Sequence, residues 1–144
     1  MGSASPSAKA ALLFLGAVVI AACGDDVPAN PLAGGIVATF EVTGQQFKVW
    51  ITNDGTIEDV LALQSGESTA HIPNGPILRG NGAGDHNAPH GWHLDPEQTE
   101  MADVTIEVCD GAPSYVDEHI DEYVDVVGRY CPWGAEFVGI EDHR

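Results

Sequence analysis

Three histidines lie close together in the chain and could bind a metal ion. His86, His90 and His93 are separated by three and then two residues, and imidazole is a common ligand of zinc and copper. Pro89 and Gly91 argue against a helix that would bring the three rings onto one face. In a loop the rings could still converge on Zn or Cu, with a neighbouring aspartate as a fourth ligand. The alternative is a set of solvated loop histidines beside one structural histidine.

His93 could instead take part in acid–base catalysis. A small hydrolase could use it with Asp95 or Asp110, because such chemistry needs a histidine that a second polar group orients. The chain contains neither a Gly-x-Ser-x-Gly nor a His-Glu-x-x-His pattern,. The alternative is that Asp95 caps a turn and Asp110 accepts hydrogen bonds from the backbone. We therefore predict no catalytic residue and keep the hydrolase as an alternative.

The same part of the chain could form a ligand surface. Two of the three tryptophans lie between residues 91 and 133, and tryptophan combines a large apolar face with one hydrogen-bond donor. The tryptophans could equally pack around a disulfide. The residues that we assign to a possible ligand surface are Trp92, His93, Asp95, Asp110 and Trp133.

The first residues of the chain resemble the leader of a bacterial lipoprotein. Lys9 precedes an apolar run over residues 10–22, which is too short to span a bilayer,. The run ends in Ile-Ala-Ala-Cys at Cys23, a pattern in which the cysteine is acylated after the leader is cleaved. The resemblance implies a signal peptide over residues 1–22, and a lipidated Cys23 with a flexible tether over residues 23–35.

The two remaining cysteines, Cys109 and Cys131, are predicted to form a disulfide. They are separated by about 22 residues, and an exported protein meets an oxidising compartment. Closing a loop of this length should stabilise the fold by about 3 kcal/mol. The alternative is a free nucleophilic thiol.

The charge of the chain restricts its partners. Five basic residues stand against 22 acidic ones, and the formal net charge is −17. Such a charge repels nucleic acids and anionic lipid headgroups, so no nucleic-acid partner is expected. It favours cationic partners or divalent cations, and the alternative is a solvated acidic surface.

Hydrophobic periodicity predicts the elements that must position these residues. Two stretches with alternating apolar residues should form a hairpin, two stretches with apolar residues at helical spacing should form helices, and Asp54 should cap the first helix,. Val104, Ile106 and Val108 should point inward from a strand. The predicted elements are strands over 36–42, 46–52, 76–80, 92–94, 102–108 and 135–140, and helices over 56–65 and 113–127.

These elements predict a single α+β domain over residues 36–141,. We expect a mainly antiparallel sheet with two helices packed against it and one disulfide. Residues 80–84 are rich in glycine and should form a mobile loop,.

The sequence also resembles a small family of secreted domains. The resemblance rests on Trp-His-Leu-Asp-Pro from Trp92, Glu-Val-Cys-Asp from Glu107, and Tyr-Cys-Pro-Trp from Tyr130. This family is found in bacterial lipoproteins and as the N-terminal domain of a eukaryotic calmodulin-binding protein. The resemblance implies one compact domain with paired cysteines, but it implies no activity. His90 stands where the family has tryptophan and His86 has no counterpart, so a site that uses three histidines would be peculiar to this chain.

These observations favour a lipid-anchored binding or interaction module outside the cytoplasmic membrane. We expect it in a bacterial cell envelope, and Gly24 after the acylated cysteine favours the outer membrane or the cell surface. Its partners would be the membrane, through the lipid, and an envelope or extracellular ligand whose identity the sequence does not give. No catalysis and no cofactor are expected. The alternatives are a Zn- or Cu-binding lipoprotein and a small hydrolase.

Overall fold

The computed structural model describes residues 1–4, 24 and 27–144. Most of the predicted signal peptide, and Cys23 with its predicted lipid, lie outside the described residues. Within the described part of the chain, no helix is both long enough and apolar enough to pass through a bilayer.

Three strands form the first antiparallel sheet, in the order β2-β1-β7. They are β1 (Ile36–Val42), β2 (Gln45–Ile51) and β7 (Glu136–Asp142). Thr43 and Gly44 form the turn of the β1–β2 hairpin, and both have positive φ. The alternation predicted from the sequence is confirmed, because every second residue of β1 and β2 faces the core. These buried residues are Ile36, Ala38, Phe40, Val42, Phe47, Val49 and Ile51.

The second sheet is built around β3 (Ile72–Arg79), which is longer than the predicted strand over 76–80. Successive parts of β3 pair antiparallel with three short strands. These strands are β4 (Trp92–Leu94), β5 (Glu100–Ala102) and β6 (Arg129–Tyr130).

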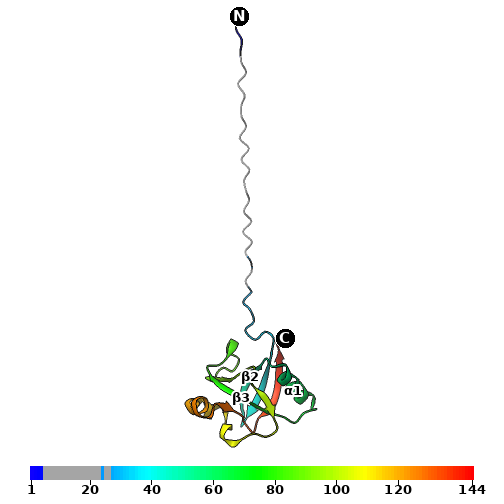
Figure 1. The fold of residues 1–144 in the computed structure, drawn as a ribbon, viewed down its shortest axis with the longest axis vertical. Coiled ribbons are helices and arrows are strands. Elements are labelled where there is room, and N and C mark those ends of the chain that lie inside the picture. The colour runs from blue at the N-terminus through cyan, green and yellow to red at the C-terminus, as the bar shows by residue number, and fades with distance from the viewer. Residues whose placement is uncertain (5–23, 25–26) are drawn as a thin grey trace.

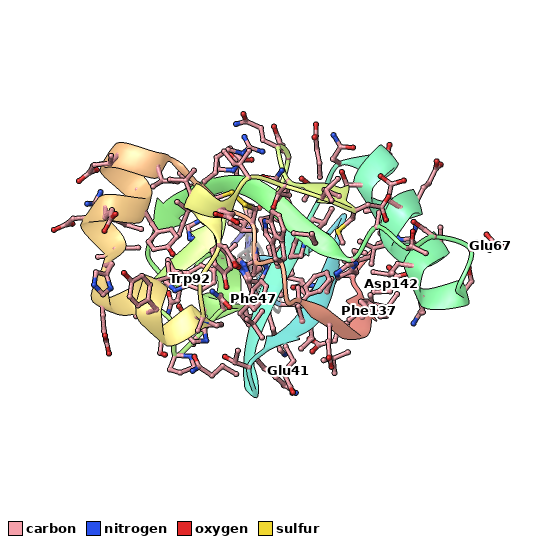
Figure 2. The ribbon with its side chains drawn as sticks, turned by 90° about the horizontal axis from the view of Figure 1, so that it is seen from below. Glu41, Phe47, Glu67, Trp92, Phe137 and Asp142 are labelled. Atoms are coloured by element: carbon pink, nitrogen blue, oxygen red, sulfur yellow. A yellow bond between two sulfur atoms is a disulfide. The ribbon has the colours of Figure 1, made fainter. Side chains whose placement is uncertain are left out.

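Aromatic side chains join the two sheets in the core. The Phe47 ring from β2 lies 5.7 Å from the Trp92 ring and 5.5 Å from the Tyr130 ring, measured between centroids. Trp92 and Tyr130 are 4.9 Å apart, edge to face. Phe47 and Trp92 lie in the middle of the molecule in Figure 2. All three side chains are buried, so the two sheets share one core.

The first helix, α1 (Asp54–Ser65), begins one residue away from the expected cap. The side chain of Asn53, and not that of Asp54, accepts a hydrogen bond from the Thr56 amide at 3.2 Å. Asparagine and aspartate are comparable caps, so the sequence did not distinguish the two. Gly66 ends the helix with φ of 80°, directly after the range predicted over 56–65.

The second helical region is interrupted, although the sequence predicted one continuous helix. It consists of α2 (Pro113–Glu118), α3 (Ile120–Glu122) and the π-helical turn η3 (Tyr123–Val127). The break lies at His119, whose φ of −121° and ψ of 31° are not helical. The His119 ring stacks on Tyr115 and is half-buried. The α1 helix and this region lie on opposite sides of the folded domain in both views (Figures 1 and 2).

The strand predicted over 102–108 is wrong. The pairing of Ile72 with Ala102 places Ala102 opposite the first residue of β3, so the residues that follow have no β3 partner. The chain continues into a 3-10 turn, η2 (Glu107–Cys109). The side chains predicted to point inward are instead exposed, Val104 by 77%, Ile106 by 65% and Val108 by 60%.

The end of the predicted tether packs against the domain. The Gly34 amide donates to the His143 carbonyl at 3.0 Å, and the His143 amide donates to the Gly35 carbonyl at 2.9 Å. The Asn30 amide group also contacts the His143 ring at 3.2 Å. Residues 30–35 therefore belong to the folded domain, and the expectation of a flexible tether through residue 35 is wrong for them.

Candidate functional site

The His86 side chain is buried beside a glycine-rich loop. It follows the short turn η1 (Ala83–Asp85), and its Nδ1 donates to the Ala83 carbonyl at 2.9 Å. Only 8% of the residue is exposed, and its Nε2 has no partner among the described residues. Burial lowers the pKa of His86. A Cβ on Gly82 would collide with this ring, so the predicted loop is shaped by the packing of His86.

The His90 side chain connects its own loop to β2 and to α2. Its Nε2 donates to the Gln46 carbonyl at 2.9 Å, and its Nδ1 lies 2.7 Å from an Asp117 carboxylate oxygen. The other oxygen of Asp117 accepts from the Gly91 amide at 2.8 Å. Both ring nitrogens are thus engaged in holding the loop to β2 and α2.

The three histidines do not converge. His86 and His93 are neighbours, with ring centroids 5.9 Å apart, but His90 is directed to Asp117 and Gln46. Among the described residues, no group of three or more His, Cys, Asp and Glu side chains is arranged to hold a metal ion. Binding of zinc or copper by His86, His90 and His93 stays a prediction.

The structure does not pair His93 with Asp95. The His93 Nδ1 donates to the Gly80 carbonyl at 2.7 Å. One Asp95 oxygen accepts from the amides of Glu97 and Gln98, at 2.9 and 3.0 Å, which makes Asp95 the cap of a turn. Neither side chain lines any of three depressions that the described residues form.

The predicted ligand surface is divided by the fold. Trp92 is fully buried in the aromatic core, so its assignment to a surface is wrong. The apolar alternation of β4 turns Trp92 and Leu94 inward, and this alternation is the signal from which the burial of Trp92 could have been predicted. Asp110 and Trp133 do lie together, because an Asp110 carboxylate oxygen accepts from the Trp133 amide at 2.9 Å.

The predicted disulfide between Cys109 and Cys131 is confirmed. An apolar depression lies beside it. The depression has a volume of about 410 Å³. The Trp133 indole donates to the Ile106 carbonyl at 3.4 Å, which places the exposed Trp133 against the same segment. We call this site the disulfide depression, and it is lined by Asn74, Val104, Thr105, Ile106, Cys109 and Arg129.

Arg129 gives the disulfide depression its charge. Its Nε donates to the Asn74 side-chain oxygen at 3.0 Å, and an Nη is 3.5 Å from the Asn74 carbonyl. Among the lysines and arginines that the structure describes, Arg129 alone makes no ion pair. The other three pair with carboxylates at 2.6–2.9 Å, as Lys48 with Glu141, Arg79 with Asp121 and Asp125, and Arg144 with Asp142.

Two further depressions have a different character. One of about 270 Å³ lies against His86 and the ion pair between Lys48 and Glu141. The other, of about 420 Å³, is bordered by acidic residues at the start of α1, among them Glu58 and Asp59. The disulfide depression is the one that joins exposed apolar side chains to an unpaired positive charge.

Comparison with known proteins identifies the family. A family model described as the BP-74 N-terminal domain matches residues 36–143. No match was found among curated proteins or among solved structures. The matched residues include every strand from β1 to β7 and both cysteines of the disulfide. The chain therefore belongs to the BP-74 N-terminal domain family.

Proposed function

We propose that this chain is a non-catalytic binding module that a lipid on Cys23 anchors outside the cytoplasmic membrane of a bacterial cell. The binding role rests on one observation, the exposure of Val104, Ile106 and Val108 beside the disulfide depression. A run of exposed apolar side chains next to a hollow is typical of an interaction site.

Two observations support the location. The Ile-Ala-Ala-Cys pattern ends at Cys23, and the pairing of Cys109 with Cys131 suits an oxidising compartment,.

The packing of residues 30–35 limits how far the domain can reach from its anchor. Six residues separate Cys23 from Asn30, and a fully extended chain spans about 3.5 Å per residue. The domain would therefore be held within on the order of 25 Å of the membrane surface. Its ligand would lie in the membrane-proximal layer of the envelope.

Photo-crosslinking in intact cells tests the binding role. A photoreactive amino acid is placed at Val104 and, as a matched control, at Val138 of β7, whose side chain is 52% exposed. We expect an adduct of discrete mass from position 104 and none from position 138. No adduct at 104, or the same adducts at both positions, would contradict the proposed surface.

A further inference from the structure

We propose that the disulfide depression binds the carboxyl-terminal segment of another polypeptide, with Arg129 holding its terminal carboxylate. This inference rests on the proposed function, because it takes the same surface as the ligand site. It adds the chemical class of the ligand, an extended peptide with an apolar last residue and a free carboxylate.

Arg129 carries a positive charge that no carboxylate of the described residues neutralises by an ion pair. The chain carries 22 acidic residues, and the other described lysines and arginines are paired with carboxylates. Asn74 holds one edge of the Arg129 guanidinium through its Nε, so the group is oriented. A guanidinium presents parallel donors that match a carboxylate, and such charge-assisted pairs are among the stronger hydrogen bonds.

The backbone of residues 104–106, which line the same depression as Arg129, has amides that are free to bind a ligand. Ile106 is extended, with φ of −87° and ψ of 149°. The amides of Val104, Thr105 and Ile106 make no backbone hydrogen bond to any residue that the structure describes. Amides of an extended chain alternate in direction, so a peptide that runs alongside this segment as an added strand could pair with every second one of them. A fatty acid would leave them unused, so the geometry favours a peptide.

The residues that line the depression indicate which side chains the ligand should carry. Val104, Ile106 and Cys109 provide apolar contacts for the last side chain of the peptide. Asp103 and Glu107 lie on the same segment, and the whole chain is strongly acidic. We therefore expect basic or polar residues upstream of the apolar carboxyl terminus.

Affinity selection from a defined peptide pool tests the proposal. The purified, lipidated protein in detergent micelles is mixed with an equimolar pool of pentapeptides of randomised sequence that end in a free carboxylate. A second pool is identical but ends in an amide. We expect the protein to retain peptides with an apolar last residue, and to retain the free acids about tenfold better than the amides.

Two variants make the test specific to the site. Arg129→Gln should abolish the preference for the free acid, whereas Arg79→Gln, which removes a charge from an arginine paired with Asp121 and Asp125, should leave it unchanged. Circular dichroism of each variant reports whether it is folded. The unaltered protein alone shows whether free acids are retained better than amides. The proposal can therefore be contradicted even if Arg129→Gln does not fold.

Other outcomes would contradict the proposed binding of a carboxyl-terminal peptide. Equal retention of acids and amides, or no retention of either, would exclude recognition of a peptide carboxylate. Binding of decanoate that Arg129→Gln weakens, with no peptide retained, would assign the site to fatty acids instead. A position-specific adduct at Val104 in cells together with a negative peptide pool would leave the binding surface standing and remove this ligand class alone.

Discussion

At the scale of single residues, one buried amide connects the two sheets. The Asn87 side-chain oxygen accepts from the Lys48 amide of β2 at 2.7 Å, and its nitrogen donates to the Trp92 carbonyl of β4 at 2.7 Å. Asn87 is 1% exposed. The packing of the two sheets removes the Lys48 amide and the Trp92 carbonyl from water, and the Asn87 side chain provides a hydrogen-bond partner for each.

Replacing Asn87 should destabilise the domain. Asn87→Ala leaves a buried amide and a buried carbonyl without partners, and we expect a loss of about 2–4 kcal/mol in the free energy of unfolding. Urea denaturation followed by tryptophan fluorescence measures it. Gln64→Ala on the exposed face of α1 is the matched control, with a change below about 0.5 kcal/mol. A similar small change for Asn87→Ala would show that the bridge contributes little.

The buried His86 should make stability depend on pH. Burial lowers its pKa in the folded state below the ordinary value near 6.5, so below that pH the unfolded chain binds more protons. This contribution to stability is present above about pH 6.5 and is lost as the pH falls through the folded-state pKa. We expect His86→Gln to reduce the decline in the free energy of unfolding between about pH 7.5 and about pH 5. An unchanged decline, or an NMR titration that places the His86 pKa above its ordinary value, would contradict this.

The environment of the histidines could not be read from the sequence. Their spacing suggested convergence, but the partners that separate them are remote, since His90 contacts Asp117 and Gln46. By contrast Asp95, which bonds the amides two and three residues ahead, was predicted as a turn cap. Local hydrogen bonds follow from sequence, whereas contacts between distant segments need the fold.

At the scale of elements, the alternating strands were predicted most accurately. The strands β1 and β2 each bury one face, so their period of two residues marks the core,. The same period in Val104, Ile106 and Val108 misled, because β3 offers no partner beyond Ile72. Alternation therefore identified an extended segment, but it did not show whether the apolar face was covered.

The disulfide should supply a substantial part of the domain's stability. Its cysteines are 22 residues apart, and removing both as Cys109→Ala with Cys131→Ala should lower the free energy of unfolding by about 3 kcal/mol. Chemical denaturation of the two proteins measures the difference. A reducing agent should destabilise the unaltered protein by a similar amount and leave the double variant unaffected. If the reducing agent destabilises both proteins equally, the loss does not come from this bond.

At the scale of the whole molecule, the net charge and the proposed lipid anchor would act together. The net charge of the whole chain, −17, would repel anionic headgroups, while the short connection to Cys23 would hold the domain near them. The disulfide depression would then face ligands that reach the membrane-proximal space. Cationic partners would be drawn to the domain before contact.

The proposed location of the domain depends on the acylation of Cys23. Mass spectrometry of the protein purified from the envelope of cells that make it tests this directly. We expect the N-terminal peptide to begin at Cys23 and to carry the added mass of a diacylglyceryl group and an N-acyl chain, and the Cys23→Ser protein to lack both. An N-terminal peptide with unmodified Cys23, or a chain that is cleaved elsewhere, would contradict the proposed anchor.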